Sequence, residues 1–496
     1  MYSYNNLKYY NMKRRYLILG CSAFLLFGLA GCKKQIENQF PSDGTSSEVL
    51  FTTSGGFEQA TRGMYYQMTH AEHYIGGSDA AVSWVSTMDL LADNLILQQT
   101  GRGSQRSIGN YQYFPSSEIQ TFSEIYSVIR SANLIIENKD NIDGTDNFYG
   151  EALTVRAMAH FDLLRLYSKP VSGPQADLNG LGVPYITSTD LSLKPGRGTV
   201  KQTYDNVVAD LTAALNVINA DNGVGRLNRT AVLGLLSRVY LYGGEWQKCV
   251  DAATACLEVD ADPGSLGSFP DIWTDASNDG VIFKVIFTEQ DRGSDGQIKV
   301  GVAYNQTLPA GIKSEWVVTK SLFDLYEDND VRKTSYITQT SFGGADYNAI
   351  IKYYAKADGT TPGILDVKYL RVAEVLLNRA EAYAMLDNEA LALADLNSLR
   401  VNRYDGFVDG TETGTDLDAA IALERRLELA FESDRWFTLK RLGLPVERDE
   451  FGDFADGTGT PASVPGLAPG DFKWQLPLAQ NDVQANENLE QNPGYN

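Results

Sequence analysis

Apolar residues recur every three to four positions along much of this chain, which is the spacing of amphipathic helices. Seven stretches share this spacing and are expected to be helical. They cover residues 54–69, 119–139, 148–168, 199–220, 230–259, 372–400 and 417–441. Between 261 and 367 the spacing changes, and short β-rich pieces at 281–287 and 350–354 alternate with Gly/Asp-rich loops. The pattern predicts a mostly α protein with one inserted, loop-rich lobe that contains short β-strands.

Three of the helical stretches carry the same local motif: a leucine, an arginine three residues later, and a tyrosine or histidine four residues after that. The motif is formed by Leu153, Arg156 and His160, by Leu235, Arg238 and Tyr242, and by Leu376, Arg379 and Tyr383. On a helix the arginine and the ring share one face. At 230–259 and 372–400 a short turn and a second helix follow. These units resemble tetratricopeptide (TPR) repeats, each of which leaves an apolar face that a neighbouring unit covers.

The beginning of the chain has the pattern of a secretory signal. A basic cluster at 13–15 precedes an apolar run at 16–30, which is shorter than the ~20 residues that cross a bilayer. Leu29, Ala30 and Gly31 directly precede Cys32, an order that resembles the bacterial lipoprotein box. We expect cleavage before Cys32, lipidation of Cys32 and a polar tether up to residue 50. An ordinary cleaved signal is the alternative, and translation from Met1 or Met12 is left open.

The charge of the chain excludes one class of ligand. The chain has 42 basic and 63 acidic residues, a net charge of −21. The expected signal holds four basic residues and no acid, so the mature chain has 38 basic and 63 acidic residues and a charge of −25. Such a surface repels nucleic acid, which is bound through Lys and Arg. It also favours a neutral glycan over a polyanionic one.

Cysteine gives no disulfide framework for the exported part. Cys249 and Cys256 are seven residues apart on an expected helix, which separates their Cα atoms by about 10 Å along the axis. A disulfide needs less than about 7 Å. Both are expected to be small core residues.

Five segments, taken in order, resemble the SusD/RagB family of outer-membrane lipoproteins. They are residues 151–170, 225–246, 368–384, 424–441 and the closing Gln-Asn-Pro-Gly-Tyr at 491–495. The chain departs from the family pattern at Ser168, where glycine is usual, and at Ser433 and Asp434, which replace a Glu-Gly type of turn. The residues after Cys32 also lack the dense acidic cluster often linked to surface export, so the final leaflet is left open.

The resemblance implies a TPR-like helical scaffold, lipid-anchored at the outer membrane and facing the cell exterior. It also implies a SusC-like TonB-dependent transporter as partner, an oligosaccharide or in some members a peptide as ligand, and no catalysis. The expected organisation is a signal peptide at 1–31, lipidated Cys32 and tether at 32–50, helical part at 51–260, inserted lobe at 261–367, TPR-like helices at 368–441 and loop-rich tail at 442–496.

An enzyme would need a reacting group. Glu424, Glu428 and Glu432 fall on one face of an expected helix, which is the arrangement of a paired-carboxylate glycosidase. Three arginines in the same segment keep such carboxylates ionised, whereas a general acid needs a raised pKa. A structural charge network is therefore expected, with a surface glycoside hydrolase as the weaker alternative.

No cofactor is expected, although calcium is left open at two acidic loops. The loop at 326–333 lacks the glycine and glutamate of a calcium loop, and the loop at 409–416 lacks the ligand spacing. His70 and His73 could share a helix face and hold a metal, but a solvated pair is the expected state. His160 is expected to pack within its repeat.

A neutral glycan is held by flat aromatic faces and directed hydrogen bonds. The resemblance places the glycan site where the early loops meet the inserted lobe. Eight residues of those two regions are the candidates: Tyr74, Trp84, Asp93, Asn94, Gln98 and Arg102 from the first connection, and Tyr304 and Trp316 from the inserted lobe. Peptide capture and a protein-assembly scaffold are the alternative functions. The sequence does not identify the sugar, its linkage or the transporter-contact residues.

Overall fold

The computed structural model describes ten segments of the chain. They are residues 47–71, 74–75, 83–101, 103, 105–116, 121–289, 304, 306–308, 311–359 and 362–495. The chain forms two compact units, residues 1–56 and 57–496. The described part of the first unit holds α3 (Ser47–Leu50) and the start of α4 (Ser54–His70). Everything below concerns the second unit, and Cys32 lies outside the described residues.

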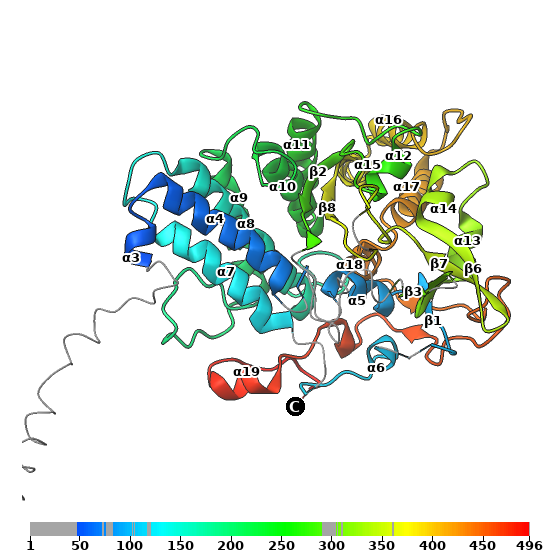
Figure 1. The fold of residues 1–496 in the computed structure, drawn as a ribbon, viewed down its shortest axis with the longest axis horizontal. Helices are drawn as coiled ribbons and strands as arrows, with labels where there is room; N and C mark the ends of the chain where they lie inside the picture. Colours follow the sequence, from blue (N-terminus) through cyan, green and yellow to red (C-terminus); the bar gives the residue numbers. More distant parts are fainter. Residues whose placement is uncertain are drawn as a thin grey trace, which may run out of the picture. The chain divides into compact units, whose positions relative to one another are not determined.

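Helices dominate the second unit, as the spacing of apolar residues predicts (Figure 1). In its first part α7 (Thr121–Glu137) packs against α8 (Asp146–Tyr167), and α8 packs against α9 (Val200–Leu215). A capping box at Thr199 begins α9, because its side chain accepts a hydrogen bond from the Gln202 N–H. None of the described helices combines the length and apolar character that crossing a membrane requires.

Two helix–turn–helix units follow the TPR pattern and stack on each other. The first unit consists of α10 (Arg229–Gly243) and α11 (Trp246–Leu257), and the second of α15 (Val372–Ala384) and α16 (Glu389–Arg400). Helix α11 packs against α15, so the second unit covers a face of the first. Gly244 ends α10 in the left-handed conformation, with φ +70°. The prediction of a mostly helical, TPR-like scaffold is confirmed.

The arginine of the recurring motif forms an ion pair with a neighbouring helix in all three cases. The pairs are Arg156–Asp210, Arg238–Glu374 and Arg379–Asp395. The first joins α8 to α9 and the last joins α15 to α16. Arg238 of α10 instead reaches α15 in the next unit, at 2.6 Å. The motif arginine therefore connects the two helices of a pair in two cases, and in the third case it connects two neighbouring helix–turn–helix units.

Short antiparallel ladders and helices form the inserted lobe. Strand β2 (Val281–Val285) pairs with β8 (Val367–Arg371), β3 (Gln306–Leu308) with β4 (Gly311–Lys313), and β6 (Ile337–Phe342) with β7 (Ala345–Ile350). The helices of the lobe are α12 (Phe269–Trp273), α13 (Lys320–Leu325) and α14 (Val331–Tyr336).

The strand predicted at 350–354 was misplaced. Gly343 and Gly344 both have positive φ and close a two-residue hairpin turn, so the second strand runs from 345 to 350 and ends where the prediction began.

The single helix predicted at 417–441 is two helices in the structure. Helix α17 (Gly414–Glu428) ends before a short connection, and α18 (Asp434–Leu442) follows it. Phe431 and Ser433 in the connection have φ of +69° and +62°. The break lets the Ser433 N–H donate to a carboxylate of Asp89, 3.0 Å away. The prediction was wrong because this partner is distant in the sequence and the segment holds no Gly or Pro to mark the break.

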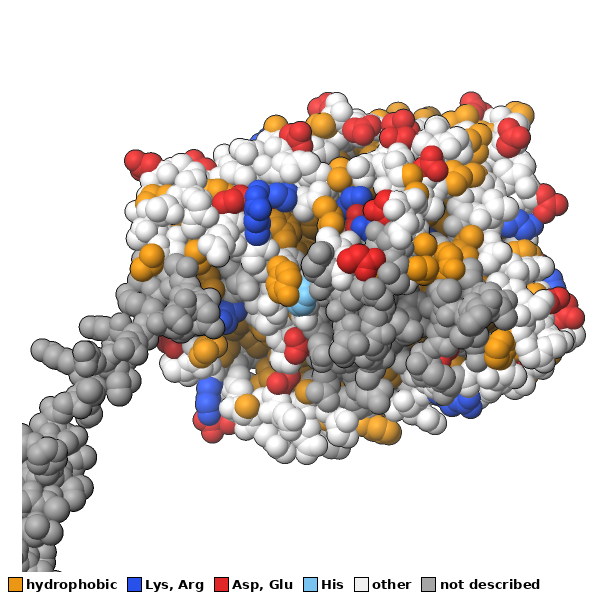
Figure 2. Space-filling model, viewed as in Figure 1, with side chains coloured by type: hydrophobic (Ala, Val, Ile, Leu, Met, Phe, Trp, Pro, Cys, Tyr) orange, Lys and Arg blue, Asp and Glu red, His pale blue; other side chains and the backbone are white. Residues whose placement is uncertain are grey.

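The remaining elements lie in the C-terminal part of the chain, after α18. Strand β9 (Val446–Glu447) pairs with β10 (Gly466–Leu467), and α19 (Gln480–Ala485) follows a short 3-10 turn at Phe472–Trp474. Cys249 and Cys256 are free and buried, as predicted, and burial raises the pKa of each thiol to about 12. Figure 2 shows acidic side chains scattered over one face of the described surface rather than gathered in one patch.

Candidate functional site

The first connection and the inserted lobe meet in the structure. Helix α5 (Trp84–Leu91) leads into β1 (Leu95–Leu97), which pairs with β5 (Trp316–Val318). Leu97 lies opposite Trp316, and the Gln98 N–H donates to the Glu315 carbonyl at 2.7 Å. The Tyr304 hydroxyl donates to Asp89 of α5 at 3.0 Å. The two groups of candidate residues therefore converge on one place, which we call the β1–β5 junction: α5, β1, β5 and Tyr304.

The aromatic candidates at this junction are buried, so the structure does not present them as open platforms for a sugar. Tyr74 and Tyr304 are 0% exposed, and Trp84 and Trp316 are 3% exposed. Their faces and edges are occupied by protein. Trp84 meets Phe437 edge to face, with ring centroids 5.8 Å apart.

The burial of these rings has specific causes. The Tyr74 hydroxyl donates to Asp162, and the ring of Tyr304 stacks on Tyr353 at 5.9 Å. The ring of Trp316 lies against Gly109 at the end of α6 (Arg106–Gly109), where an added Cβ would come within 2.1 Å of the indole. Sequence position alone placed these rings in loops, but residues 83–97 fold into a helix and a strand whose side chains join the core.

The polar candidates hold α5 and β1 against the C-terminal helices. Asp93 accepts two hydrogen bonds from Arg435, at 2.8 and 2.7 Å, and Asn94 accepts one from Arg426 at 2.8 Å. Burial raises the pKa of Asp93, but the hydrogen bond from Arg435 and the charges of both arginines outweigh burial and lower it below its usual value. Gln98 is 1% exposed, and Arg102 lies outside the described residues.

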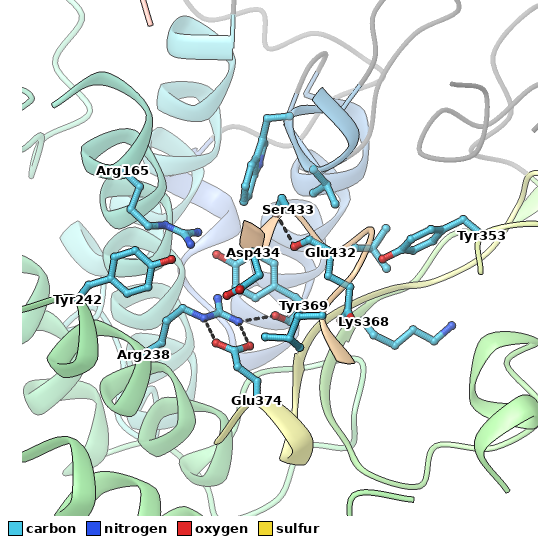
Figure 3. Close-up of a pocket in the computed structure, with 14 residues that line it drawn as sticks. Arg165, Arg238, Tyr242, Tyr353, Lys368, Tyr369, Glu374, Glu432, Ser433 and Asp434 are labelled. Atoms are coloured by element: carbon cyan, nitrogen blue, oxygen red, sulfur yellow. Dashed lines mark hydrogen bonds and ion pairs between the residues drawn. The ribbon is translucent and has the colours of Figure 1, made fainter. Parts of the chain in front are cut away.

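A polar cavity of about 40 Å³ lies beside Trp84, between α8, α10, β8 and the connection before α18. Arg165 and Tyr242 lie on one side of it and Tyr353 on the other (Figure 3). Arg238 crosses it to reach Glu374 and the Tyr369 carbonyl.

Several hydrogen-bond donors of this cavity have no protein acceptor. Within the described residues, the Trp84 Nε1 and the hydroxyls of Tyr242 and Tyr353 make no hydrogen bond. Such groups are commonly satisfied by buried water. The cavity therefore offers donors to water or another small polar group.

Asp89 is the carboxyl group that sequence reasoning missed. It is fully buried, accepts hydrogen bonds from Ser433 and Tyr304, and forms no ion pair within the described part of the chain. Burial raises its pKa to about 7, although both hydrogen bonds act in the opposite direction. An aspartate within an apolar helix run gives no sequence signal of this kind.

The three glutamates form a charge network as predicted, but not with the arginines of their own segment. Arg425 pairs with Asp434, and Arg426 and Arg435 pair with Asp93, so the partners of the glutamates come from outside the segment. Glu428 contacts Arg332, Arg371 and Arg403 in the core. Burial raises the pKa of Glu428, but the charges of Arg403 and Arg371 hold it well below its usual range. An ionised carboxylate of this kind is unsuited to general-acid catalysis.

The candidate metal residues have other partners. Among the described residues no group of three or more His, Cys, Asp or Glu side chains could hold a metal ion. In the loop at 326–333, Asp328 pairs with Lys333, and Asp330 caps α14 and pairs with Arg332.

The two histidines that the structure describes, His70 and His160, contact neighbouring aromatic rings. His70 stacks on Tyr66, and His73 lies outside the described residues. His160 accepts a hydrogen bond from the Ile186 N–H and stacks on Tyr185, so it packs within its repeat as predicted. Burial lowers the pKa of His160 to about 3, which keeps the ring neutral.

Comparison with known families gives two matches along this chain. Residues 78–241 match a family described as "Starch-binding associating with outer membrane", and residues 350–495 match the "SusD family". The chain is 26% identical over 466 residues to SusD-like protein P38 of Formosa agariphila, a match that covers 82% of this chain and 86% of that protein.

Solved structures share the fold over most of both chains. A putative sugar binding protein from Bacteroides vulgatus ATCC 8482 superposes with a TM-score of 0.77 at 26% identity, covering 89% of this chain and 98% of its own. A SusD superfamily protein from Bacteroides thetaiotaomicron VPI-5482 has a TM-score of 0.75 at 24% identity, covering 88% and 99%. At this coverage the likeness concerns the fold as a whole and not a single unit of it.

Proposed function

Because this chain belongs to the SusD/RagB family, we propose that it is a lipid-anchored outer-membrane protein that captures oligosaccharide and delivers it to a SusC-like TonB-dependent transporter. The observation that carries the proposal is the likeness, over 89% of the chain, to a structure described as a putative sugar binding protein. The starch-binding, outer-membrane description matched by residues 78–241 supports the same ligand class and location.

The anchor and the direction of transport follow from this assignment. The lipoprotein box at Cys32 supplies the membrane attachment, and the acyl chains hold it because each buried CH₂ contributes about 0.8 kcal/mol. The protein acts as a capturing lid over the transporter. Affinity for each sugar unit is modest, because captured glycan has to be released into the transporter.

In this proposal the glycan binds at the surface beside the β1–β5 junction, where the chain after β1 reaches solvent at Thr100. The candidate residues converge there from distant parts of the sequence, and their buried rings and ion pairs make the junction rigid. A rigid support fixes the geometry of a binding surface better than a free loop does. Trp84 and Trp316 therefore position the contact surface instead of stacking on the sugar.

The test is binding of a broad glycan array by the full chain in detergent, with a peptide library as a second arm. We expect saturable binding to neutral oligosaccharides. Binding of peptides and of no glycan would replace the proposal with peptide capture, and binding of neither, together with failure to copurify with a transporter, would refute it.

The location of the contact is tested with two glycine variants. Gly109→Ala displaces the Trp316 indole and is expected to weaken glycan binding about tenfold or more, which corresponds to about 1.4 kcal/mol. Gly63→Ala on α4 is the control, because an added Cβ there meets no atom within 4 Å. Equal affinities for both variants, with the Trp316 fluorescence environment changed in Gly109→Ala, would move the glycan site away from the junction.

A further inference from the structure

A buried lysine that pairs with no acidic side chain of the described residues lies at the end of α18. Lys440 is 6% exposed, and its Nζ donates to the Arg165 carbonyl at 2.6 Å. This bond caps the C-terminal end of α8, where a cation is favourable. Within the described residues Lys440 forms no ion pair, and an ammonium group has two further hydrogens to donate.

The charged groups around Lys440 do not neutralise it. Arg165 is paired with Asp162, and Arg441 is paired with both carboxylate oxygens of Glu381, each at 2.6 Å. Burial lowers the pKa of Lys440 to about 7, and the charge of Arg165 acts in the same direction. Lys440 therefore has no ion-pair partner of its own within the described residues.

Lys440 lines a hollow of about 60 Å³ that opens to the surface. Its floor contains Lys440 and Trp474, both 6% exposed, and its rim includes Leu444, which is 44% exposed. The rim glycine Gly470 has φ +79°, and a Cβ at this position would come within 3.0 Å of the Gln175 Oε1. The hollow is therefore open at this point because Gly470 has no side chain.

Further donors lie next to Lys440. Gln175 contributes an amide to the same hollow, and the Gln475 amide, which donates one hydrogen bond to the Asn492 Oδ1 at 3.5 Å, has a second hydrogen to donate. An adjoining hollow of about 20 Å³ is lined by Lys440, Ser168 and Tyr242, and the hydroxyls of Ser168 and Tyr242 make no hydrogen bond within the described residues. Ser168 is 0% exposed and Tyr242 is 6% exposed, so neither is satisfied by bulk solvent.

We propose that this Lys440 hollow is a binding site for a carboxylate group of a small ligand. One ammonium that pairs with no described acidic side chain matches one negative charge, and a charge-assisted hydrogen bond is the strong form of that contact. The amides can donate to the second carboxylate oxygen, and the Trp474 ring suits the apolar part of the ligand. Asp471 also lines the hollow and repels anions in proportion to their charge, so a singly charged carboxylate is repelled less than a more highly charged anion.

The site is separate from the β1–β5 junction and does not depend on the proposed glycan function. A sugar acid and the end of a peptide are two sources of such a carboxylate, and they share the chemistry that Lys440 recognises. Lys169 and Asp471 are the other titratable side chains that line the hollow, and Arg165, which lines the adjoining hollow, stays charged throughout the working pH range.

The test is calorimetric titration of the full chain in detergent with sodium acetate, at constant ionic strength, at pH 6 and pH 8.5. We expect saturable binding that is about tenfold or more tighter at pH 6, because Lys440 loses its proton as the pH rises through its pKa. At pH 8.5 binding should take up a proton, which is measured by repeating the titration in buffers of different ionisation enthalpy.

Variants and matched ligands complete the experiment. Lys440→Met should abolish acetate binding, Gln175→Ala at the rim should weaken it severalfold, and Lys201→Met, at an exposed pair on α9, should leave it unchanged. Methyl glucuronoside against methyl glucoside tests the sugar source, and an acetylated dipeptide against its C-terminal amide tests the peptide source.

Several results would overturn the proposal. The first is the absence of saturable acetate binding by the wild-type chain. The second is that the neutral ligands bind as tightly as the carboxylates, or that chloride gives the same heats as acetate. The third is acetate binding at pH 8.5 without proton uptake.

Discussion

At the scale of single residues, the junction contrasts two aspartates four positions apart on the same segment. Asp93 is held by Arg435, which lowers its pKa. Asp89 forms no ion pair within the described residues, and burial raises its pKa to about 7. Asp89 connects α5 to the α17–α18 connection through Ser433, and Asp93 connects the residues after α5 to α18 through Arg435. Their opposite electrostatic surroundings give opposite effects of pH on the stability of the fold.

Replacing Asp89 by asparagine is expected to stabilise the protein at high pH. The folded state raises the pKa of Asp89 from its unfolded value near 4 to about 7, so the wild type loses stability as pH rises through that window. Asp89→Asn cannot ionise, so its free energy of unfolding at pH 8 should exceed that of the wild type by about 2 kcal/mol. The gain should shrink as pH falls towards 4, which urea unfolding at several pH values measures.

Asp93→Asn is the matched comparison, with the opposite sign. The lowered pKa of Asp93 contributes stability at neutral pH that is lost as pH falls through its folded-state pKa. This variant should therefore be less stable than the wild type at pH 8. A stabilised Asp93→Asn, or an Asp89→Asn variant with no pH-dependent gain, would contradict the assignment of the two carboxyl groups.

At the scale of helices, the motif arginines connect neighbouring elements, and their partners differ in a way that the sequence does not show. Arg379 pairs with Asp395 of the helix that follows it. Arg238 instead pairs with Glu374 of the next TPR-like unit. One motif therefore performs two tasks, closing a helix pair and stacking one unit on another.

The stacking contact is expected to be the more costly one to remove. Arg238→Met leaves Glu374 buried, with 8% of its side chain exposed and without its ion-pair partner, and should lower the free energy of unfolding by about 3 kcal/mol or more. Arg379→Met is the matched control. The Arg379 side chain is 18% exposed, so this pair lies nearer to solvent and the loss should be smaller. Urea unfolding midpoints of the two variants give the comparison, and equal losses would contradict the stacking role.

Helices are the part of the fold that sequence periodicity predicted well, because an amphipathic face needs only local spacing. Breaks and burial depend on distant partners. The break before Ser433 is stabilised by Asp89, and the burial of Trp316 depends on the missing side chain of Gly109. Family resemblance correctly predicted that the candidate residues of the two regions lie close together. The expectation that their rings are exposed was wrong, because position in a predicted loop does not determine whether a side chain packs into the core.

At the scale of the whole molecule, an acidic, mostly helical chain begins with a segment that resembles a lipoprotein signal. The chain has a net charge of −21, which disfavours polyanionic ligands, and the family description that residues 78–241 match concerns association with the outer membrane. In the proposed function, membrane attachment matters more than high affinity for the glycan, since it would keep the protein next to a transporter.

Cys32→Ala is expected to release the protein from the membrane. The substitution removes the acylation site, and no described helix can replace it as a membrane span. Fractionation of cells should show the wild type in the outer-membrane fraction and the variant outside it, and intact mass should show the acyl chains only on the wild type. A variant that stays in the outer membrane would contradict the anchor.

The account depends on a protein that holds an oligosaccharide without cleaving it. The most direct measurement is native mass spectrometry of the full chain with a neutral oligosaccharide, followed by analysis of the sugar after prolonged incubation. We predict a complex whose mass equals the protein plus one intact oligosaccharide, with the sugar recovered at its original length. Shortened sugar in proportion to the protein, or no complex with any neutral glycan, would contradict the account.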